Sequence, residues 1–159
     1  MEIHLCKAKK EEKETLYRLL QYSLFEESAT DLNEMNDTGI FEYKWFENYF
    51  KDDDRDAFIV KETGTEKILG FVMINEYVQK VDNGHSIAEF MVIPKYRRNG
   101  IGKKVAFECF NMYKGNWEVS PSYGNEKAYL FWKSVIDEYT DNKNEFIDRI
   151  FVFKAEEKG

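Results

Sequence analysis

The spacing of apolar residues predicts where helices lie in the chain. Leu16, Leu19, Leu20 and Leu24 recur at intervals of three and four residues, which is the spacing of one face of a helix. Two later segments carry the same periodicity, with charged residues between the apolar ones. We therefore expect amphipathic helices over residues 10–26, 100–113 and 125–136.

Residues 41–50 differ from these segments because six of their ten positions are aromatic. We interpret this segment as a further helix whose aromatic side chains pack on a sheet. It follows a polar, turn-rich stretch over residues 27–40 and precedes an aspartate-rich loop over residues 51–56.

Short runs rich in apolar and β-branched residues predict the strands. Residues 57–62 and 68–77 flank a short loop that contains Gly64, and this arrangement is typical of a β-hairpin. Residues 85–93 are apolar on both faces except at Ser86 and Glu89, which predicts a central strand buried on both sides. The expected strands are residues 3–7, 57–62, 68–77, 85–93 and 116–120, with two more between residues 139 and 154.

The resulting order, β-α-α-β-β-β-α-β-α-β-β, predicts a mixed sheet flanked by helices, an α/β fold of the α+β type. The chain has 159 residues, of which 43% are hydrophobic and 33% charged. This length and balance suit one globular domain over residues 1–159, which can bury a core without a disulfide or a metal.

Composition argues against several classes of function. The net charge of −7 disfavours binding of nucleic acid or of an anionic membrane through the overall field of the protein. The longest apolar run, residues 68–74, is far shorter than a membrane-spanning helix, and residues 1–13 lack the apolar region of a signal peptide. The two cysteines, Cys6 and Cys109, form no C-x-x-C motif, so we expect reduced thiols, a cytoplasmic location and no zinc site of the common kinds.

Candidate chemistry lies where the strand at residues 85–93 gives way to the helix at residues 100–113. A basic turn with two glycines, Gly100 and Gly102, connects them, and the first N–H groups of a helix lack partners within it. Such a turn can bind a phosphate. A Walker A loop does not fit the spacing, and the dinucleotide motif G-x-G-x-x-G fails because Val105 occupies its third glycine position.

Arg97, Gly100 and Gly102 fill the fixed positions of [Q/R]-x-x-G-x-[G/A], and the segment containing them resembles the acetyl-CoA-binding motif of the GNAT N-acetyltransferases. Residues 125–132 resemble the second motif of that family, N-x-x-A-x-x-[LF]-Y, beginning at Asn125. The resemblance implies a mostly antiparallel sheet of six or seven strands with about four helices, and acetyl-CoA as co-substrate.

The resemblance also implies roles for individual residues. The backbone of Phe90, Met91 and Val92 would bind the pantetheine arm, and the Val92 N–H would stabilise the oxyanion. The turn amides would hold the pyrophosphate, and Asn125 would contact the cofactor arm, although its position equally suits a helix N-cap. The cofactor-binding residues implied are Phe90, Met91, Val92, Arg97, Arg98, Asn99, Gly100, Ile101, Gly102, Lys103 and Asn125.

Three residues are candidates for the general base. Glu118 is the first choice because Trp117-Glu118-Val119 resembles the L-E-V strand that carries the catalytic glutamate in protein N-terminal acetyltransferases of the family. Glu89 is the alternative, since a lone carboxylate in an apolar strand is costly unless it is paired or functional. His85 is the only imidazole near the expected site.

The proton donor to the departing thiolate is less defined, because Trp132 stands where the family motif has a tyrosine and an indole cannot act as that acid. Tyr129, one helical turn earlier, can replace it, or the thiolate leaves unaided, or the protein binds CoA without turnover.

Together these features predict an acetyl-CoA-dependent N-acetyltransferase that acts on an amine of a small molecule or peptide. The alternative is a non-catalytic CoA-binding or regulatory module on the same fold. Any aromatic residues of 41–50 that line the acceptor pocket would suit a small acceptor with an apolar or cationic part, and the acidic surface favours a cationic amine. The sequence leaves a homodimer open, and we expect no nucleic acid, membrane or metal partner.

Overall fold

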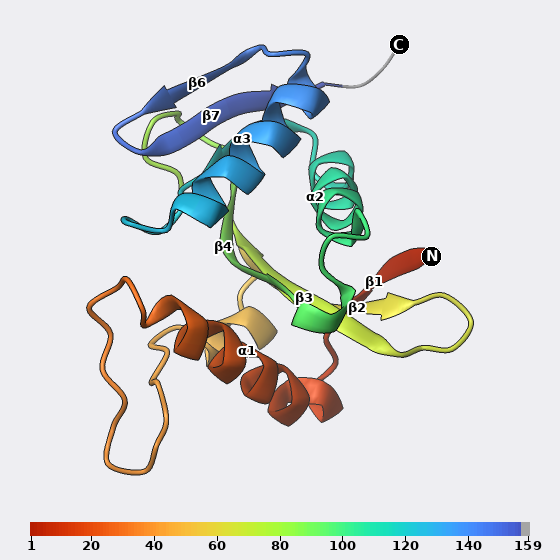
Figure 1. Cartoon of the computed structure of the whole chain (residues 1–159), viewed down its shortest axis with the longest axis vertical. Helices are drawn as coiled ribbons and strands as arrows, with labels where there is room; N and C mark the ends of the chain where they lie inside the picture. The colour runs from red at the N-terminus through yellow and green to blue at the C-terminus, as the bar shows by residue number, and fades with distance from the viewer. Residues whose placement is uncertain (157–159) are drawn as a thin grey trace.

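The computed structural model describes residues 1–156, and in this part of the chain seven strands form a single sheet (Figure 1). The strand order is β1-β2-β3-β4-β5-β7-β6, and every neighbouring pair is antiparallel except β4 and β5. The sequence-based prediction of a mixed, mostly antiparallel sheet is therefore confirmed. The strands are β1 Ile3–Lys7, β2 Arg55–Glu62, β3 Ile68–Asn75, β4 His85–Val92, β5 Gly115–Val119, β6 Asn144–Ile147 and β7 Ile150–Ala155.

Helices cover both faces of the sheet. Helix α1 (Lys13–Glu27) and the chain that follows it lie on one face, whereas α2 (Ile101–Met112) and α3 (Glu126–Thr140) lie on the other (Figure 1). Short 3-10 turns occur at Lys10–Glu12, Glu47–Phe50 and Pro94–Tyr96. No helix within residues 1–156 is both long enough and apolar enough to cross a membrane.

Alternation along the strands divides the core into two halves. One half lies between the sheet and helices α2 and α3, and includes Phe110, Trp117 and Phe153. The other lies between the sheet and α1, and includes Leu20 and Phe71. Neighbouring residues of one strand therefore face different layers of the molecule.

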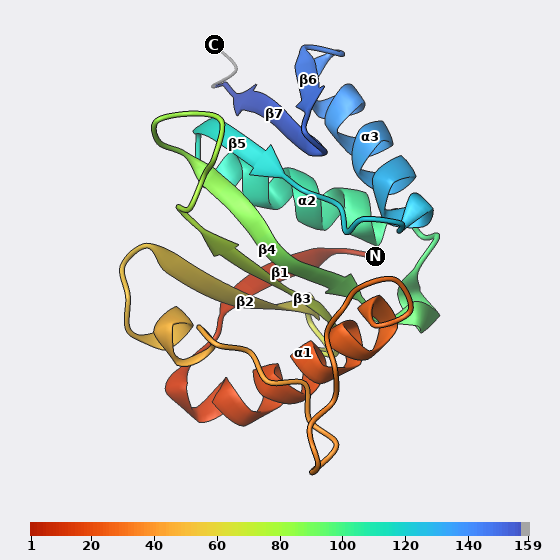
Figure 2. The same cartoon turned by 90° about the vertical axis from the view of Figure 1, so that its left-hand side faces the viewer.

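Strands β4 and β5 separate soon after they meet (Figure 2). Among the described residues, their parallel pairing consists of His85 with Trp117 and Ser86 with Glu118. The expectation that residues 85–93 are buried on both sides was wrong for most of the strand, since residues 85–90 are only half-buried. Within residues 1–156, β4 has no strand partner on its β5 side beyond Ser86.

The predicted helix over residues 41–50 was also wrong. The segment forms a 3-10 turn only at Glu47–Phe50, so the part of the chain that the structure describes has three α-helices rather than four. Phe41 and Tyr49 are nevertheless buried against the sheet. The Gln21 side-chain amide replaces helical hydrogen bonds here, because its Nε2 donates to the Phe41 carbonyl and its Oε1 accepts from the Phe41 N–H, both at 2.8 Å.

The remaining differences concern the ends of elements. Helix α3 continues to Thr140, so the first strand of the C-terminal pair begins at Asn144 and not at 139. Asp141 and Asn142 adopt left-handed backbone angles, with φ of 57° and 65°, which end the helix.

We expect Gln21→Ala to lower the free energy of unfolding by about 1–3 kcal/mol, because it leaves both polar groups of the Phe41 backbone without their partner. Urea denaturation measures this change. Tyr22→Ala is the control, since Tyr22 is exposed on the same helix and its loss should change stability by less than about 0.5 kcal/mol. Equal effects of the two substitutions would contradict the role assigned to Gln21.

Candidate active site

The turn between β4 and α2 presents a row of unpaired backbone amides. Within residues 1–156, none of the N–H groups from Arg98 to Lys103 donates a hydrogen bond to the protein. Arg98 and Gly100 adopt left-handed backbone angles, with φ of 70° and 75°. Consecutive amides in such a turn, at the N-terminus of a twelve-residue helix, form a concave site for an anion.

The two glycines of this turn, Gly100 and Gly102, have different surroundings. A Cβ atom on Gly100 would meet no atom of residues 1–156 within 4 Å, so its surroundings are open to a ligand. A Cβ atom on Gly102 would lie 2.9 Å from the Phe131 ring. The absence of a side chain at Gly102 therefore allows α2 and α3 to pack together, which the sequence motif alone did not reveal.

The side chains of the turn have varied surroundings. Arg97 braces the turn, because its Nε donates to the Val92 carbonyl at 2.7 Å and its two terminal nitrogens contact the Glu26 carboxylate at 2.7 and 3.1 Å. Lys103 pairs with Glu138 at 3.0 Å on the neighbouring helix. Other predicted residues differ in exposure: Arg98 and Asn99 are exposed, and Ile101 is buried in the core.

The edge of β4 that faces β5 carries further unpaired backbone groups. The Ile93 N–H donates to the Leu69 carbonyl on the opposite side of β4, at 2.8 Å. Because backbone polar groups alternate in direction along a strand, those of Val92 and Phe90 point toward the opening, whereas those of Met91 point toward β3. Two of the three predicted strand residues thus face the opening, and Met91 does not.

Aromatic side chains close the opening on the α3 side. Phe90 packs edge-on against Trp132, with ring centroids 4.8 Å apart, and Phe131 packs against both. Tyr129 lies instead against the β6–β7 hairpin, where its ring contacts Phe146 and Phe151.

The Asn125 side chain acts as the N-cap of α3 and accepts a hydrogen bond from the Ala128 N–H at 3.0 Å. Asn125 is therefore an N-cap, which is one of the two roles that the sequence suggested for it. Its remaining amide protons are the groups that could reach a ligand.

Glu118 is buried, and backbone groups of the protein bind both of its carboxylate oxygens. Its two carboxylate oxygens accept hydrogen bonds from the Gln79 and Lys80 N–H groups, at 2.8 and 2.6 Å. These bonds hold the β3–β4 loop against β5. Transfer of a proton to Glu118 would compete with one of them, which makes it a poor candidate for the base.

His85 lies at the closed end of the two strands, away from the opening. Its ring stacks on Tyr113, with ring centroids 4.4 Å apart, and also contacts Trp117. Burial lowers the pKa of His85, against opposing effects of Glu76 and Asp56.

Glu89 points to the α1 face of the sheet, into a cavity of about 460 Å³. Its Oε1 is enclosed and has no hydrogen-bond partner among the described residues. Burial raises the pKa of Glu89 well above its usual range, the charge of Glu27 raises it further, and the nearby Tyr43 hydroxyl opposes the shift. Burial also raises the pKa of Glu27 and of Tyr43. Glu89 therefore holds a proton more readily than an exposed carboxylate.

The cavity is acidic and aromatic. Among the described residues that line it are four glutamates and one lysine, together with Phe41, Tyr43 and Trp45. The sequence pattern singles out neither Glu27, at the last position of α1, nor a contact between Tyr43 and Glu89. No local pattern could have done so, because the two residues meet Glu89 only across the fold.

Comparison with known proteins identifies the family. The family model described as "Acetyltransferase (GNAT) family" matches residues 16–136. The chain belongs to the GNAT acetyltransferase family. Both predicted motifs lie within the matched residues. No curated protein matches the chain in sequence.

Solved structures of GNAT proteins share the fold at low sequence identity. An acetyltransferase from Thermus thermophilus is 14% identical over 97% of both chains, with a TM-score of 0.68. A spermidine N-acetyltransferase from Vibrio cholerae, in complex with CoA and spermine, is 8% identical over 97% of this chain and 96% of its own, with a TM-score of 0.65. NAA60 from Arabidopsis thaliana, in complex with a bisubstrate analogue, is 13% identical over 96% of this chain and 97% of its own, with a TM-score of 0.64.

We expect Gly102→Ala to destabilise the protein by about 1–3 kcal/mol, because the new methyl group overlaps the Phe131 ring. Phe131→Leu should relieve this overlap, so the double variant should lose less stability than the sum of the two single variants. A double-mutant cycle by urea denaturation measures the coupling. Simple additivity would show that the two helices do not depend on this contact.

Proposed function

We propose that this protein is an acetyl-CoA-dependent N-acetyltransferase and that residues 1–159 act as one catalytic domain. The observation that carries the proposal is the continuity of two sets of unpaired backbone groups. The edge of β4 exposes the N–H and C=O of Phe90 and the N–H of Val92, and the next turn exposes the amides from Arg98 to Lys103. A ligand with both amide groups and a pyrophosphate, as in acetyl-CoA, satisfies both sets.

The residues present fit acetyl-CoA in detail. The turn amides and the open space at Gly100 accommodate the pyrophosphate. The backbone groups of Phe90 bind the pantetheine amides, as a missing strand would. The Val92 carbonyl already accepts a hydrogen bond from Arg97, whereas the Val92 N–H has no partner among residues 1–156. This N–H can therefore donate to the oxyanion that forms on the thioester carbonyl. Bound acetyl-CoA supplies the acetyl group and the thiolate leaving group.

In the proposed mechanism Glu89 serves as the general base. An alkylamine acceptor has a pKa of about 10 and must lose a proton before its nitrogen attacks the thioester. Glu89 precedes Val92 by three residues, roughly 10 Å along the strand, which leaves space for the amine and a relaying water. Its raised pKa makes it a stronger proton acceptor than an ordinary carboxylate. The nitrogen then bonds to the acetyl carbon, and the bond from this carbon to sulfur breaks.

The cavity beside Glu89 favours a cationic acceptor. Its glutamates attract a protonated amine, and the face of Tyr43 suits an alkylammonium group, whereas the Trp45 ring already contacts Lys44 and Arg55. The solved structures of similar fold include proteins named as spermidine and aminoglycoside N-acetyltransferases, and both kinds of acceptor are cationic. These neighbours support the class of acceptor and not its identity.

We expect acetyl-CoA to raise the melting temperature of the protein, while NAD and ATP at the same concentration raise it much less. Release of free CoA in the presence of a panel of polyamines, aminoglycosides and amino-terminal peptides then tests turnover. Stabilisation without CoA release from any amine would favour the non-catalytic CoA-binding module. Equal stabilisation by all three nucleotides would contradict the proposed cofactor site.

We expect Glu89→Gln to lower kcat by about 10²–10⁴-fold while acetyl-CoA affinity stays unchanged, since only proton transfer is lost. In the wild type, kcat should rise with pH through the raised pKa of the carboxyl, and this limb should vanish in the variant. Glu108→Gln is the matched control, because it removes an exposed carboxylate on the outer side of α2. A variant with full activity and an unchanged pH profile would exclude Glu89 as the base.

The same variant should change stability in a pH-dependent way. The folded-state pKa of Glu89 lies above its ordinary value of 4.5, so folding favours the protonated form. Stability from this carboxyl is therefore present at pH 4 and is lost as pH rises through the folded-state pKa. We expect Glu89→Gln to be more stable than the wild type at pH 8 and similar to it at pH 4, as measured by urea denaturation. A variant that is equally destabilised at both pH values would contradict the shift.

A further inference from the structure

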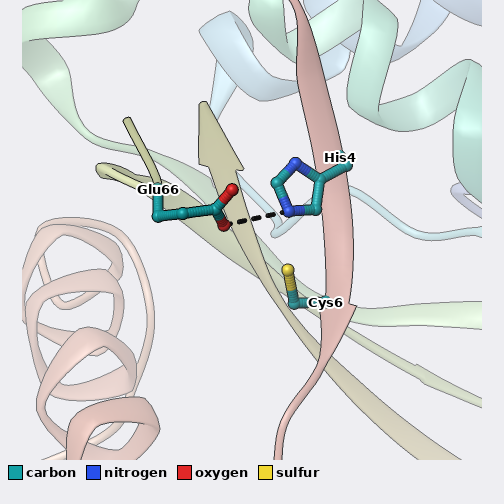
Figure 3. A group of neighbouring side chains, drawn as sticks. All are labelled: His4, Cys6 and Glu66. Atoms are coloured by element: carbon teal, nitrogen blue, oxygen red, sulfur yellow. Dashed lines mark ion pairs between the residues drawn. The ribbon is translucent and has the colours of Figure 1, made fainter. Parts of the chain in front are cut away.

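A second cluster of reactive side chains lies at the edge of the sheet, on strand β1. His4 and Cys6 are two residues apart, so they project from the same side of the strand. The turn between β2 and β3 brings Glu66 to face them (Figure 3). One potential ligand atom from each of the three residues lies within 4.8 Å of the others, and His4 Nε2 is 3.1 Å from Glu66 Oε2.

We propose that His4, Cys6 and Glu66 form a binding site for a zinc ion. Imidazole nitrogen, thiolate sulfur and carboxylate oxygen are the three donor types that bind zinc in proteins. Calcium and magnesium prefer oxygen ligands alone, so this donor set disfavours them. The expectation of no zinc site rested on the absence of local cysteine motifs, and such motifs do not detect ligands that are about 60 residues apart in sequence.

A neighbouring hydroxyl orients the imidazole as a ligand. His4 Nδ1 lies 3.2 Å from Thr63 Oγ1, and a proton on Nδ1 leaves Nε2 free to bind a metal. The turn that carries Thr63 and Glu66 is itself anchored, because the Thr63 N–H donates to the Glu2 carbonyl and the Glu66 N–H donates to the Glu62 carbonyl, both at 2.9 Å. The site thus has an oriented histidine and a fixed backbone beneath the carboxylate.

The spacing suits zinc after small side-chain rotations. Tetrahedral bonds of about 2.0–2.3 Å place ligand atoms about 3.3–3.7 Å apart. His4 Nε2 and Glu66 Oε2 need to separate slightly, and the Cys6 sulfur needs to approach them by about 1 Å at most. The side chains of His4 and Glu66 are 38% and 55% exposed, so water can supply the fourth ligand.

The charges around the cluster are compatible with a cation. Lys61 and Lys9 lie near Cys6, but Glu12 pairs with Lys61 at 3.3 Å and offsets its charge. A bound zinc ion would connect β1, which forms one edge of the sheet, to the β2–β3 turn. Because such a link exists only in the folded chain, zinc should stabilise the protein.

The test uses untagged, metal-stripped protein without acetyl-CoA, so its result does not depend on the proposed acetyltransferase activity. Zinc titration against a chromophoric chelator should show one ion per chain, and zinc should raise the melting temperature. Cobalt(II) should give a thiolate-to-metal charge-transfer band that disappears in Cys6→Ala. We expect His4→Gln and Glu66→Gln to weaken zinc binding at least tenfold, and Thr63→Val, which removes the orienting hydroxyl, to weaken it about tenfold.

Glu62→Gln is the matched control, because it removes a carboxylate from the same hairpin but not from the cluster, and zinc affinity should stay within about twofold of the wild type. Circular dichroism confirms that each variant is folded. The proposal is overturned if the wild type does not saturate at about tenfold molar excess of zinc. Cobalt binding without the thiolate band, or undiminished zinc binding by Cys6→Ala, would also overturn it.

Discussion

The separation of β4 from β5 is the constraint on which the site depends. Two strands that pair at His85–Trp117 and Ser86–Glu118 and then diverge leave backbone donors and acceptors without partners. Such groups are costly unless water or a ligand satisfies them. The rest of the structure holds this gap open: β4 pairs with β3 on its other side, β5 pairs with β7, and Phe131 fills the space beside Gly102 where α2 meets α3. The opening is therefore a consequence of the fold and not of a mobile loop.

Alternation along β4 gives this one strand three separate surfaces. The side chains of Phe90 and Val92 join the core on the α2–α3 face, and the Glu89 side chain enters the acidic cavity on the α1 face. The backbone of Phe90 and Val92 faces the opening between them. A cofactor that binds along the edge and an acceptor that enters from the α1 face would thus meet at a single strand. Residues 89–92 of β4 could then contact both the cofactor and the acceptor.

Sequence alone predicted the elements that local physics determines. The hairpin around Gly64, the periodicity of residues 125–136 and the turn from Arg97 to Lys103 depend on neighbours in the chain, and the structure contains all three elements. The aromatic segment at 41–50 was wrong as a helix, because its backbone partner is the distant side chain of Gln21. The surroundings of Glu118 and Glu89 could not be predicted from the sequence for the same reason. The backbone amides that donate to the Glu118 carboxylate lie 38 and 39 residues away in sequence. The cavity around Glu89 is lined by a loop whose position no local sequence pattern predicts.

The aromatic contacts of α3 bear on how the thiolate leaves. Trp132 occupies the motif position of the usual acid, yet its ring is packed against Phe90, and an indole N–H does not supply a proton at neutral pH. Tyr129 stacks on Phe151 in the β6–β7 hairpin, so its ring is engaged on the side of α3 toward β7. A thiol has a pKa of about 8.5, far below that of an alcohol, so CoA can depart as the thiolate without an acid. Within the proposed mechanism, proton removal from the amine is then the step that needs the protein most. Glu89, an enclosed carboxylate of strongly raised pKa, lies on the strand where that step would occur.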